Sequence, residues 1–206
     1  MRSLIDHARV FPKRIEDRRE EFAELARGQR PQALFISCSD SRVMPSLFTG
    51  ARPGEIFELR TAGNIVPRYR PQAACAVAGT LEFAVEALHV PDIVVCGHSH
   101  CGAVRALIHR PTVTDMPLVE RWIDWAGHRP ASPAEREPSP SLGDADVDAD
   151  AVTRRHVLTQ LEHLRTYPCV ARRLTDGRLR LHAWFYTVET GRVLTHRPGT
   201  GAFEPL

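Results

Sequence analysis

Two cysteines and one histidine occupy positions from which their side chains could bind one metal ion. Cys38 follows the apolar run QALFIS, whereas His98 and Cys101 follow a second apolar run, DIVVCG. His98 and Cys101 are three residues apart, about one turn at the start of a helix, so both side chains can reach the same ion. Two thiolates and one imidazole suit Zn²⁺ and leave a fourth tetrahedral position open. The sequence therefore predicts a zinc site with room for another ligand.

The fourth position decides whether such a site is structural or catalytic. A structural zinc site is normally closed by a further Cys or His. His100 lies between the expected ligands in sequence, but we expect its side chain to point elsewhere. The open position therefore favours a site that binds water or substrate.

Asp40 and Arg42 follow Cys38 at alternate positions in the sequence CSDSR. A carboxylate two residues from a zinc thiolate could itself occupy the fourth position and block it. A bidentate ion pair with Arg42 would hold Asp40 off the metal and orient its free lone pair. An exposed ion pair would contribute little, but the apolar run before it favours a buried pair.

The elements that position these residues alternate between buried strands and helices. We expect strands at 32–37, 55–60 and 92–97, and helices at 11–28, 73–90, 100–110, 117–126 and 151–164. This alternation predicts right-handed crossovers and a parallel sheet, whose strands share one carboxyl edge. Cys38 and His98, 60 positions apart in the chain, can therefore meet there. Residues 178–198 predict two more strands around a hairpin turn at 189–191.

The length and composition favour one globular domain. A single domain over residues 1–206 fits the length, and the Pro- and Asp-rich stretch 127–150 reads as a surface loop. The net charge of +2 is too small to favour a nucleic acid or an anionic membrane as a partner. The charged N-terminus lacks the apolar region of a secretory signal, and no apolar stretch is long enough to span a membrane. A cytoplasmic protein is therefore expected.

The remaining cysteines and histidines carry weaker signals. In a reducing compartment all five cysteines should be thiols. We expect the cysteines outside the expected site to be buried or partly buried side chains that contribute only packing. His156 and His163 read as surface or packing residues, because neither follows an expected strand.

The sequences CSDSR and GHSHCGAV together resemble the paired motifs of the β-class carbonic anhydrases. The stretches GQRP, RPGEIFELRTAGNIV and LHAWFYTVETG agree with them, so the resemblance covers nearly the whole chain and is weakest at 127–150. It implies an α/β fold with a mostly parallel four-stranded sheet, an extra edge strand and flanking helices. It also implies an N-terminal helical arm, residues 1–28, that embraces a partner subunit.

The resemblance assigns roles to individual residues. It places Zn²⁺ on Cys38, His98 and Cys101, and it identifies Asp40 and Arg42 with the catalytic dyad of the family. The residues that it implies for substrate binding are Gln29, Phe57, Phe83 and Gly102. Gln29 and Phe57 would come from the neighbouring subunit, which implies a homodimer or a higher homo-oligomer.

The chain also departs from the family pattern at several positions. Phe83 stands where the family often has tyrosine, and RTAGN at 60–64 stands where it often reads R-N-x-A-N. Some members bind bicarbonate at an inhibitory site through a tryptophan, an arginine and a tyrosine. Arg60 and Tyr186 match two of these residues, but Phe35 replaces the tryptophan. We therefore expect this site to be altered or absent.

The reaction that the resemblance implies is the reversible hydration of CO₂ to bicarbonate and a proton by zinc-bound hydroxide. Two other functions stay open. The same site could hydrolyse COS or CS₂, which turnover measurements on the three gases would separate. A non-catalytic zinc-binding module is the second, and the Asp40–Arg42 pair argues against it, because a structural site needs no positioned lone pair.

Overall fold

A six-stranded sheet forms the centre of the computed structural model, which describes residues 1–108, 115–126 and 148–206. Its strand order is β2-β1-β3-β4-β5-β6, and the strands are β1 (Ala33–Cys38), β2 (Ile56–Thr61), β3 (Asp92–His98), β4 (Arg180–Tyr186), β5 (Val193–Arg197) and β6 (Ala202–Pro205). The first four strands in this order pair in parallel, whereas β5 and β6 pair antiparallel. The sheet is therefore mostly parallel, as expected, with two antiparallel strands at one side.

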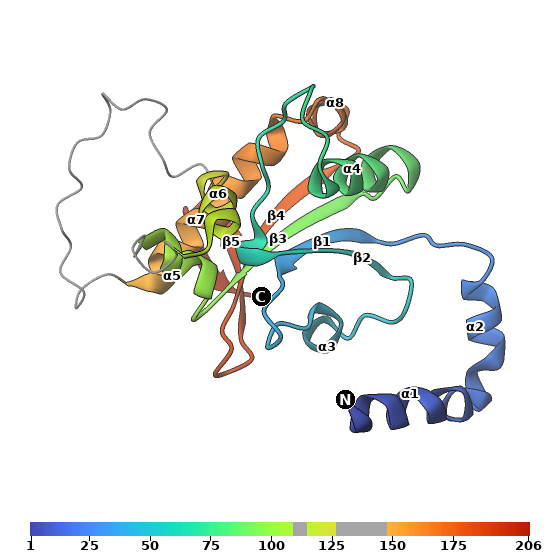
Figure 1. Cartoon of the computed structure of the whole chain (residues 1–206). Helices are drawn as coiled ribbons and strands as arrows, with labels where there is room; N and C mark the ends of the chain where they lie inside the picture. Colours follow the sequence, from blue (N-terminus) through green and yellow to red (C-terminus); the bar gives the residue numbers. More distant parts are fainter. Residues whose placement is uncertain (109–114, 127–147) are drawn as a thin grey trace, which may run out of the picture.

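Helices connect the strands (Figure 1). They are α1 (Arg2–Arg14), α2 (Arg19–Leu25), α3 (Pro45–Thr49), α4 (Ala76–Glu82), α5 (Gly102–Ile108), α6 (Pro117–Asp124), α7 (Ala149–Arg165) and α8 (Pro168–Thr175). Short 3₁₀ turns span Glu16–Arg18 and Ala62–Asn64, and a π-helical turn, Phe83–Ala87, extends α4. No helix in these described ranges is both long enough and apolar enough to cross a membrane.

The two faces of the sheet are covered unequally. Alternate residues such as Leu34 and Ile36 of β1 point to the face that α4, α7 and α8 cover, and they form the main core with Val157 and Leu164 of α7. On the opposite face, Phe35 packs against Phe48 of α3 and against Trp184. This second face is covered mainly by the short helix α3.

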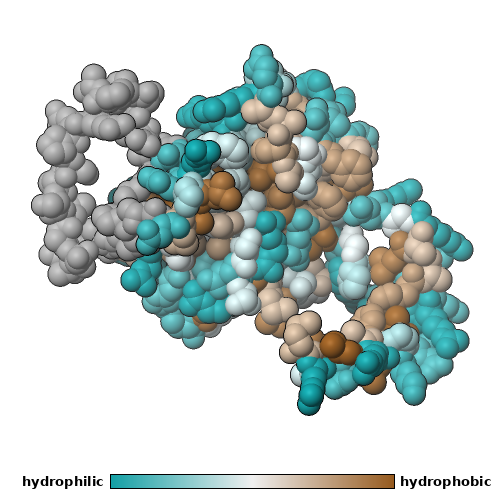
Figure 2. All heavy atoms as spheres, in the orientation of Figure 1, coloured by the Kyte–Doolittle hydropathy of each residue, from teal (hydrophilic) through white to brown (hydrophobic). Residues whose placement is uncertain are grey.

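The N-terminal arm, residues 1–28, projects away from the sheet (Figure 1). Helix α1 has no buried residue, and its apolar side chains Leu4, Ile5, Val10 and Phe11 are exposed. Figure 2 shows hydrophobic residues gathered along this arm. Within the chain, Phe11 contacts Phe22 of α2 at a ring-centroid distance of 6.0 Å, but the apolar side chains of α1 stay largely exposed. An amphipathic helix normally buries its apolar face.

Several expected boundaries were wrong. The single helix expected at 11–28 is instead α1 and α2, separated by a 3₁₀ turn, and it begins at Arg2. The helix expected at 73–90 begins at Ala76, and its last turn is π-helical. Helices α3 and α8 and strand β6 were missed, because each has fewer than ten residues and so shows little periodicity.

The expected loop at 127–150 overlaps a helix at its end. Asp148 caps the N-terminus of α7 by accepting hydrogen bonds from the amides of Asp150 and Ala151, so Ala149 and Asp150 are helical. The remainder of that expected loop, residues 127–147, lies outside the described residues.

Candidate metal centre

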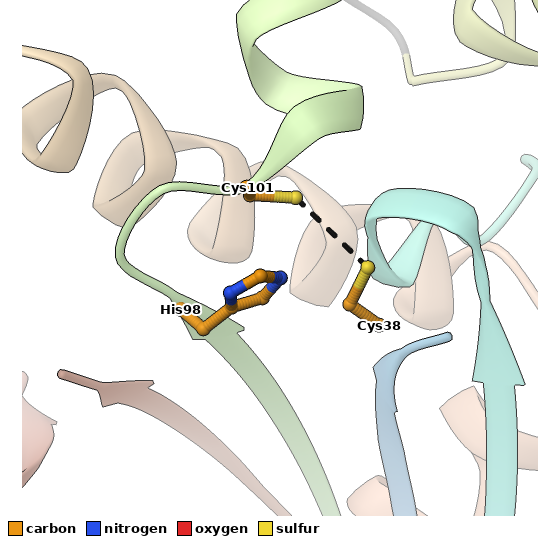
Figure 3. A group of neighbouring side chains, drawn as sticks. All are labelled: Cys38, His98 and Cys101. Atoms are coloured by element: carbon orange, nitrogen blue, oxygen red, sulfur yellow. Dashed lines mark hydrogen bonds between the residues drawn. The ribbon is translucent and has the colours of Figure 1, made fainter. Parts of the chain in front are cut away.

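The three expected metal ligands lie together at the carboxyl edge of the sheet. Cys38 ends β1, His98 ends the neighbouring parallel strand β3, and Cys101 precedes α5. Their ligand atoms lie within 4.8 Å of one another, and all three residues are buried. Figure 3 shows the side chains pointing toward one another. The parallel sheet has brought together residues far apart in sequence, as its topology predicts.

His98 presents one unpaired nitrogen to this cluster. Its Nδ1 lies 2.9 Å from the carbonyl oxygen of Ser99, so Nδ1 carries the hydrogen and donates it. Its Nε2 is buried and has no hydrogen-bond partner among the described residues. A buried lone pair of this kind is costly unless something binds it. A metal ion between Nε2 and the two sulfurs would supply that partner, and a backbone carbonyl on Nδ1 is the usual support of a metal-binding histidine.

The two thiols of the cluster are coupled. The Cys101 thiol donates to Cys38 Sγ over 4.0 Å, and this contact is the main cause that lowers the pKa of Cys38. The same contact, with burial, raises the pKa of Cys101. The pair therefore holds one thiolate readily and keeps one proton. Thiolates are the protonation state that Zn²⁺ binds, so a metal would displace the remaining proton.

The turn at residues 62–66 supports the Cys38 sulfur. The Gly63 amide donates to Cys38 Sγ over 3.3 Å. Gly63 has a φ of 74°, and a Cβ there would lie 2.8 Å from Ala103 Cβ. Both the left-handed backbone and the close approach require glycine. The RTAGN sequence that departs from the family pattern thus places a glycine amide against an expected metal ligand.

Two buried polar residues of α7 and the partly buried Trp122 of α6 hold that turn in place. His156 Nε2 donates to the Gly63 carbonyl over 2.8 Å, and Trp122 Nε1 donates to the Ala62 carbonyl over 2.8 Å. Gln160 Oε1 accepts from the Val66 amide over 3.0 Å. The sequence analysis missed these roles, since each contact spans at least 60 positions. The local signal was weak: His156, Gln160 and His163 recur at helical spacing in α7, a helix that carries other polar and charged residues as well.

Asp40 is held by Arg42 beside the cluster. Asp40 Oδ1 accepts from Arg42 Nε over 2.9 Å and from the Arg42 amide over 3.0 Å, and Oδ2 accepts from Nη2 over 2.7 Å. Asp40 is 17% exposed, whereas Arg42 is 48% exposed, so the pair is buried on its carboxylate side only. The Arg42 hydrogen bonds hold the pKa of Asp40 well below its usual range. Asp40 therefore stays ionised at neutral pH.

Arg60 fixes the backbone from which Asp40 projects. Its guanidinium donates to the carbonyl oxygens of Cys38, Asp40 and Val43 over 2.7–3.1 Å. These contacts leave its charge facing the backbone of the turn. Tyr186, which the resemblance pairs with Arg60, stacks instead on Phe48 at a centroid distance of 4.7 Å.

His100 has a different setting from the three ligands. It adopts a positive φ of 56°, and its Nε2 contacts Glu189 Oε1 in the turn between β4 and β5. Ser99 Oγ donates to Glu189 Oε2 over 2.8 Å and accepts from the Val188 amide over 2.9 Å. These contacts tie the loop between His98 and Cys101 to the hairpin. The expectation that His100 points away from the ligands is therefore met, whereas the anchoring role of Glu189 was missed.

The expected substrate residues are not gathered around this cluster by one chain. Gly102 directly follows Cys101, but Gln29 is exposed between α2 and β1. Phe57 pairs with Leu34, four positions before Cys38, which is roughly 13 Å away at the rise of a strand. Its ring lies 6.0 Å from the ring of Phe83, which is 49% exposed. The partly buried Phe57 packs against the main core, and the exposed Phe83 lies beside it, away from the metal cluster.

Comparisons with known proteins agree with this arrangement. The family model described as "Carbonic anhydrase" matches residues 33–193. A carbonic anhydrase of Pseudomonas aeruginosa is 45% identical over 194 residues, which cover 94% of this chain and 86% of that protein. The solved structure of the β-carbonic anhydrase CcaA is 34% identical, with a TM-score of 0.85, and the match covers 100% of this chain and 99% of that one.

A more distant structure carries information on assembly. It is one of two tetrameric β-carbonic anhydrases from the filamentous ascomycete Sordaria macrospora, and it is 25% identical with a TM-score of 0.74. The match covers 94% of each chain.

The support of Gly63 by α7 leads to the first prediction. We expect His156→Ala to weaken Zn²⁺ binding by about 10- to 100-fold, because the turn that aims the Gly63 amide at Cys38 loses a fixing hydrogen bond. His156→Gln, whose side-chain amide can still donate to Gly63, should keep most of the affinity. Competition with a chromophoric chelator measures the affinity.

Thr159→Ala on the same helix is the matched control, since among the described residues its hydroxyl donates only to the Arg155 carbonyl of its own helix. Its affinity for Zn²⁺ should equal that of the wild type. Equal affinity of the folded His156→Ala variant would contradict the role of this hydrogen bond.

Proposed function

This chain belongs to the β-carbonic anhydrase family, and we propose that it hydrates CO₂ reversibly to bicarbonate and a proton with Zn²⁺ on Cys38, His98 and Cys101. The observation that carries the proposal is the unpaired, buried Nε2 of His98 facing two sulfurs of a coupled thiol pair. Beside them, Asp40 is clamped by Arg42 rather than free to join them.

Zn²⁺ held by these residues would acidify a bound water and so supply the nucleophile for CO₂. Two thiolates and one imidazole favour Zn²⁺ over Mg²⁺ or Ca²⁺, which prefer oxygen ligands. Both thiols must stay reduced to bind a metal, and the described cysteines are all unpaired. A reducing compartment such as the cytoplasm therefore fits the proposed site.

In this proposal Asp40 orients the nucleophile, and Arg42 holds Asp40 in place. Asp40 is ionised and has accepting capacity beyond its hydrogen bonds to Arg42, so it would accept a hydrogen bond from the nucleophile. That bond would direct the remaining lone pair of the nucleophile toward the carbon of CO₂. Arg42 also donates to the His100 carbonyl over 3.1 Å, which fixes the clamp against the ligand loop.

We further propose that the active form is a homodimer or a larger homo-oligomer. Gln29, Phe57 and Phe83 lie away from the metal cluster of their own chain, so a partner chain would have to bring equivalent residues to it. Such apolar walls suit a small apolar substrate. The exposed apolar face of α1 offers the contact surface, and a similar fold occurs in proteins described as tetrameric.

Stopped-flow CO₂ hydration between pH 6 and 9 tests the proposal, with the metal present and after removal by a chelator. We expect activity only with Zn²⁺, and a rate that rises with pH. Two thiolates offset the charge of a divalent ion, so the nucleophile loses its proton at higher pH than with three neutral ligands. Asp40 cannot cause the rise, since its lowered pKa keeps it ionised throughout this range.

A flat profile would count against this account of the ligand set, and hydration that survives complete removal of the metal would refute the metal-dependent function. Turnover of COS and CS₂ under the same conditions tests the related hydrolase activity. A zinc-loaded protein that converts none of the three gases would instead favour a non-catalytic zinc module.

Asp40→Asn should lower kcat for hydration by at least about 100-fold while Zn²⁺ remains bound at one ion per chain. The amide removes the negative acceptor and presents an N–H toward Arg42 or the nucleophile. Metal content and the hydration rate are measured on the same sample.

Asp92→Asn is the matched control, because Asp92 forms an equivalent bidentate pair with Arg180 over 2.7 Å at the opposite end of β3. It should keep the wild-type rate. Wild-type turnover in Asp40→Asn would show that the dyad has no role.

The proposed role of the N-terminal arm in assembly gives a separate prediction. Leu4 is 68% exposed on α1, and Leu4→Asp should shift the protein toward monomers and lower hydration in proportion to the dimers lost. Sedimentation velocity and hydration at the same protein concentration provide the measurement. Arg9→Ser on the same helix is the control, since within the described part of the chain the Arg9 guanidinium pairs only with Asp6. A fully active wild-type monomer would overturn the proposed assembly.

A further inference from the structure

A second cavity, separate from the metal cluster, lies between the extended segment after the Gly63 turn and the carboxyl ends of α6 and α7. Its volume is about 480 Å³, which lies within the range of small-molecule sites. Its walls combine apolar and charged residues: Pro67, Arg68, Arg70, Ala73, Cys75, Ala78, Asp124, Trp125, His163 and Tyr167. None of the expected metal or substrate residues is among them.

The segment that forms one wall is firmly anchored to α7. His163 Nδ1 donates to the Val66 carbonyl over 2.6 Å, and the Tyr167 hydroxyl donates to the Pro67 carbonyl over 2.9 Å. The Tyr69 amide donates to Thr166 Oγ1 over 2.9 Å. Three contacts within four residues therefore fix the backbone on either side of Arg68. The cavity is shaped before any ligand binds, which reduces the entropic cost of binding.

His163, one of the residues that line this cavity, has an unpaired acceptor. It is 1% exposed, and because Nδ1 donates to a carbonyl, the neutral ring has its lone pair on Nε2. Burial lowers the pKa of His163, which favours this neutral form. Nε2 has no hydrogen-bond partner among the described residues. A buried acceptor without a donor calls for a ligand that can donate to it.

Arg68 and Arg70 bring positive charge to the same cavity. Among the described residues, no ion pair joins either guanidinium to a carboxylate. The one carboxylate in the wall, Asp124, already has an interaction of its own. The two arginines therefore give the cavity an excess of positive charge, and their planar donor groups match a carboxylate.

We propose that this cavity binds a small organic acid with an apolar body, a carboxylate for Arg68 and Arg70, and a hydroxyl or N–H group that donates to His163 Nε2. The apolar side chains of Ala78 and Trp125 contact the body of the acid. The donor requirement distinguishes this site from a general anion-binding surface, because an inorganic anion without a proton to donate leaves the histidine unpaired.

Titration calorimetry of the zinc-loaded protein with 4-hydroxybenzoate and benzoate, at about pH 7, tests the proposal. Both probes carry a carboxylate and an aromatic body, and only the first carries a neutral donor at this pH. We expect 4-hydroxybenzoate to bind about threefold to tenfold more tightly, as one hydrogen bond provides. Phenol, which lacks the carboxylate, should bind more weakly than 4-hydroxybenzoate.

Two variants locate the binding site. His163→Asn keeps a donor for the Val66 carbonyl but lacks the distal nitrogen, so it should abolish the preference for the hydroxyl group. Arg68→Ala combined with Arg70→Ala should weaken both acids by at least tenfold. Arg155→Ala, an exposed arginine of α7 outside this cavity, is the control and should change neither affinity.

The proposal is overturned if neither acid binds at millimolar concentration, or if the wild type does not distinguish the two acids. It is also overturned if the arginine substitutions leave both affinities unchanged, since the acids would then bind elsewhere, for example at the metal centre.

Discussion

The parallel pairing of β1 with β3 is the interaction on which the candidate metal centre depends. It brings the ends of two strands side by side, and Cys38 and His98 occupy those ends. A shift of the β1–β3 register by one residue would turn Cys38 to the opposite face of the sheet and break the site. The register is secured by the core, where Leu34, Ile36 and Val95 pack beneath α4 and α7. The geometry of the ligands thus follows from the burial of apolar residues several positions away.

The centre is also supported from outside the sheet. The turn at 62–66 places the Gly63 amide on Cys38 Sγ. The buried His156 of α7 and the partly buried Trp122 of α6 hold the turn by its carbonyl oxygens. Arg60 and Arg42 fix the segment after Cys38 in a similar way, one through backbone carbonyls and one through Asp40. Buried polar groups of this kind are costly if any partner is lost, so they favour a single arrangement. The result is a cluster of ligands whose orientation is fixed by hydrogen bonds on two sides.

The sequence predicts the parts of this structure that depend on local pattern. Apolar runs predicted the buried strands, and strand ends predicted that Cys38, His98 and Cys101 would meet. The supporting contacts of His156 could not be predicted from the sequence, because its hydrogen bond to Gly63 joins residues 93 positions apart and leaves no local pattern. Phe57 and Phe83 came from family resemblance alone, and one chain places them away from the cluster. Short elements such as α3 and β6 were missed because packing, rather than propensity, defines them.

The central claim is that these three residues form a zinc centre with an open fourth position beside a clamped Asp40. X-ray absorption at the zinc edge of the purified protein tests it most directly. We predict two sulfur neighbours at about 2.3 Å, one imidazole nitrogen at about 2.0 Å and one light atom that an added anion can replace. Fewer than two sulfur neighbours, or a fourth ligand that no added anion replaces, would contradict the account.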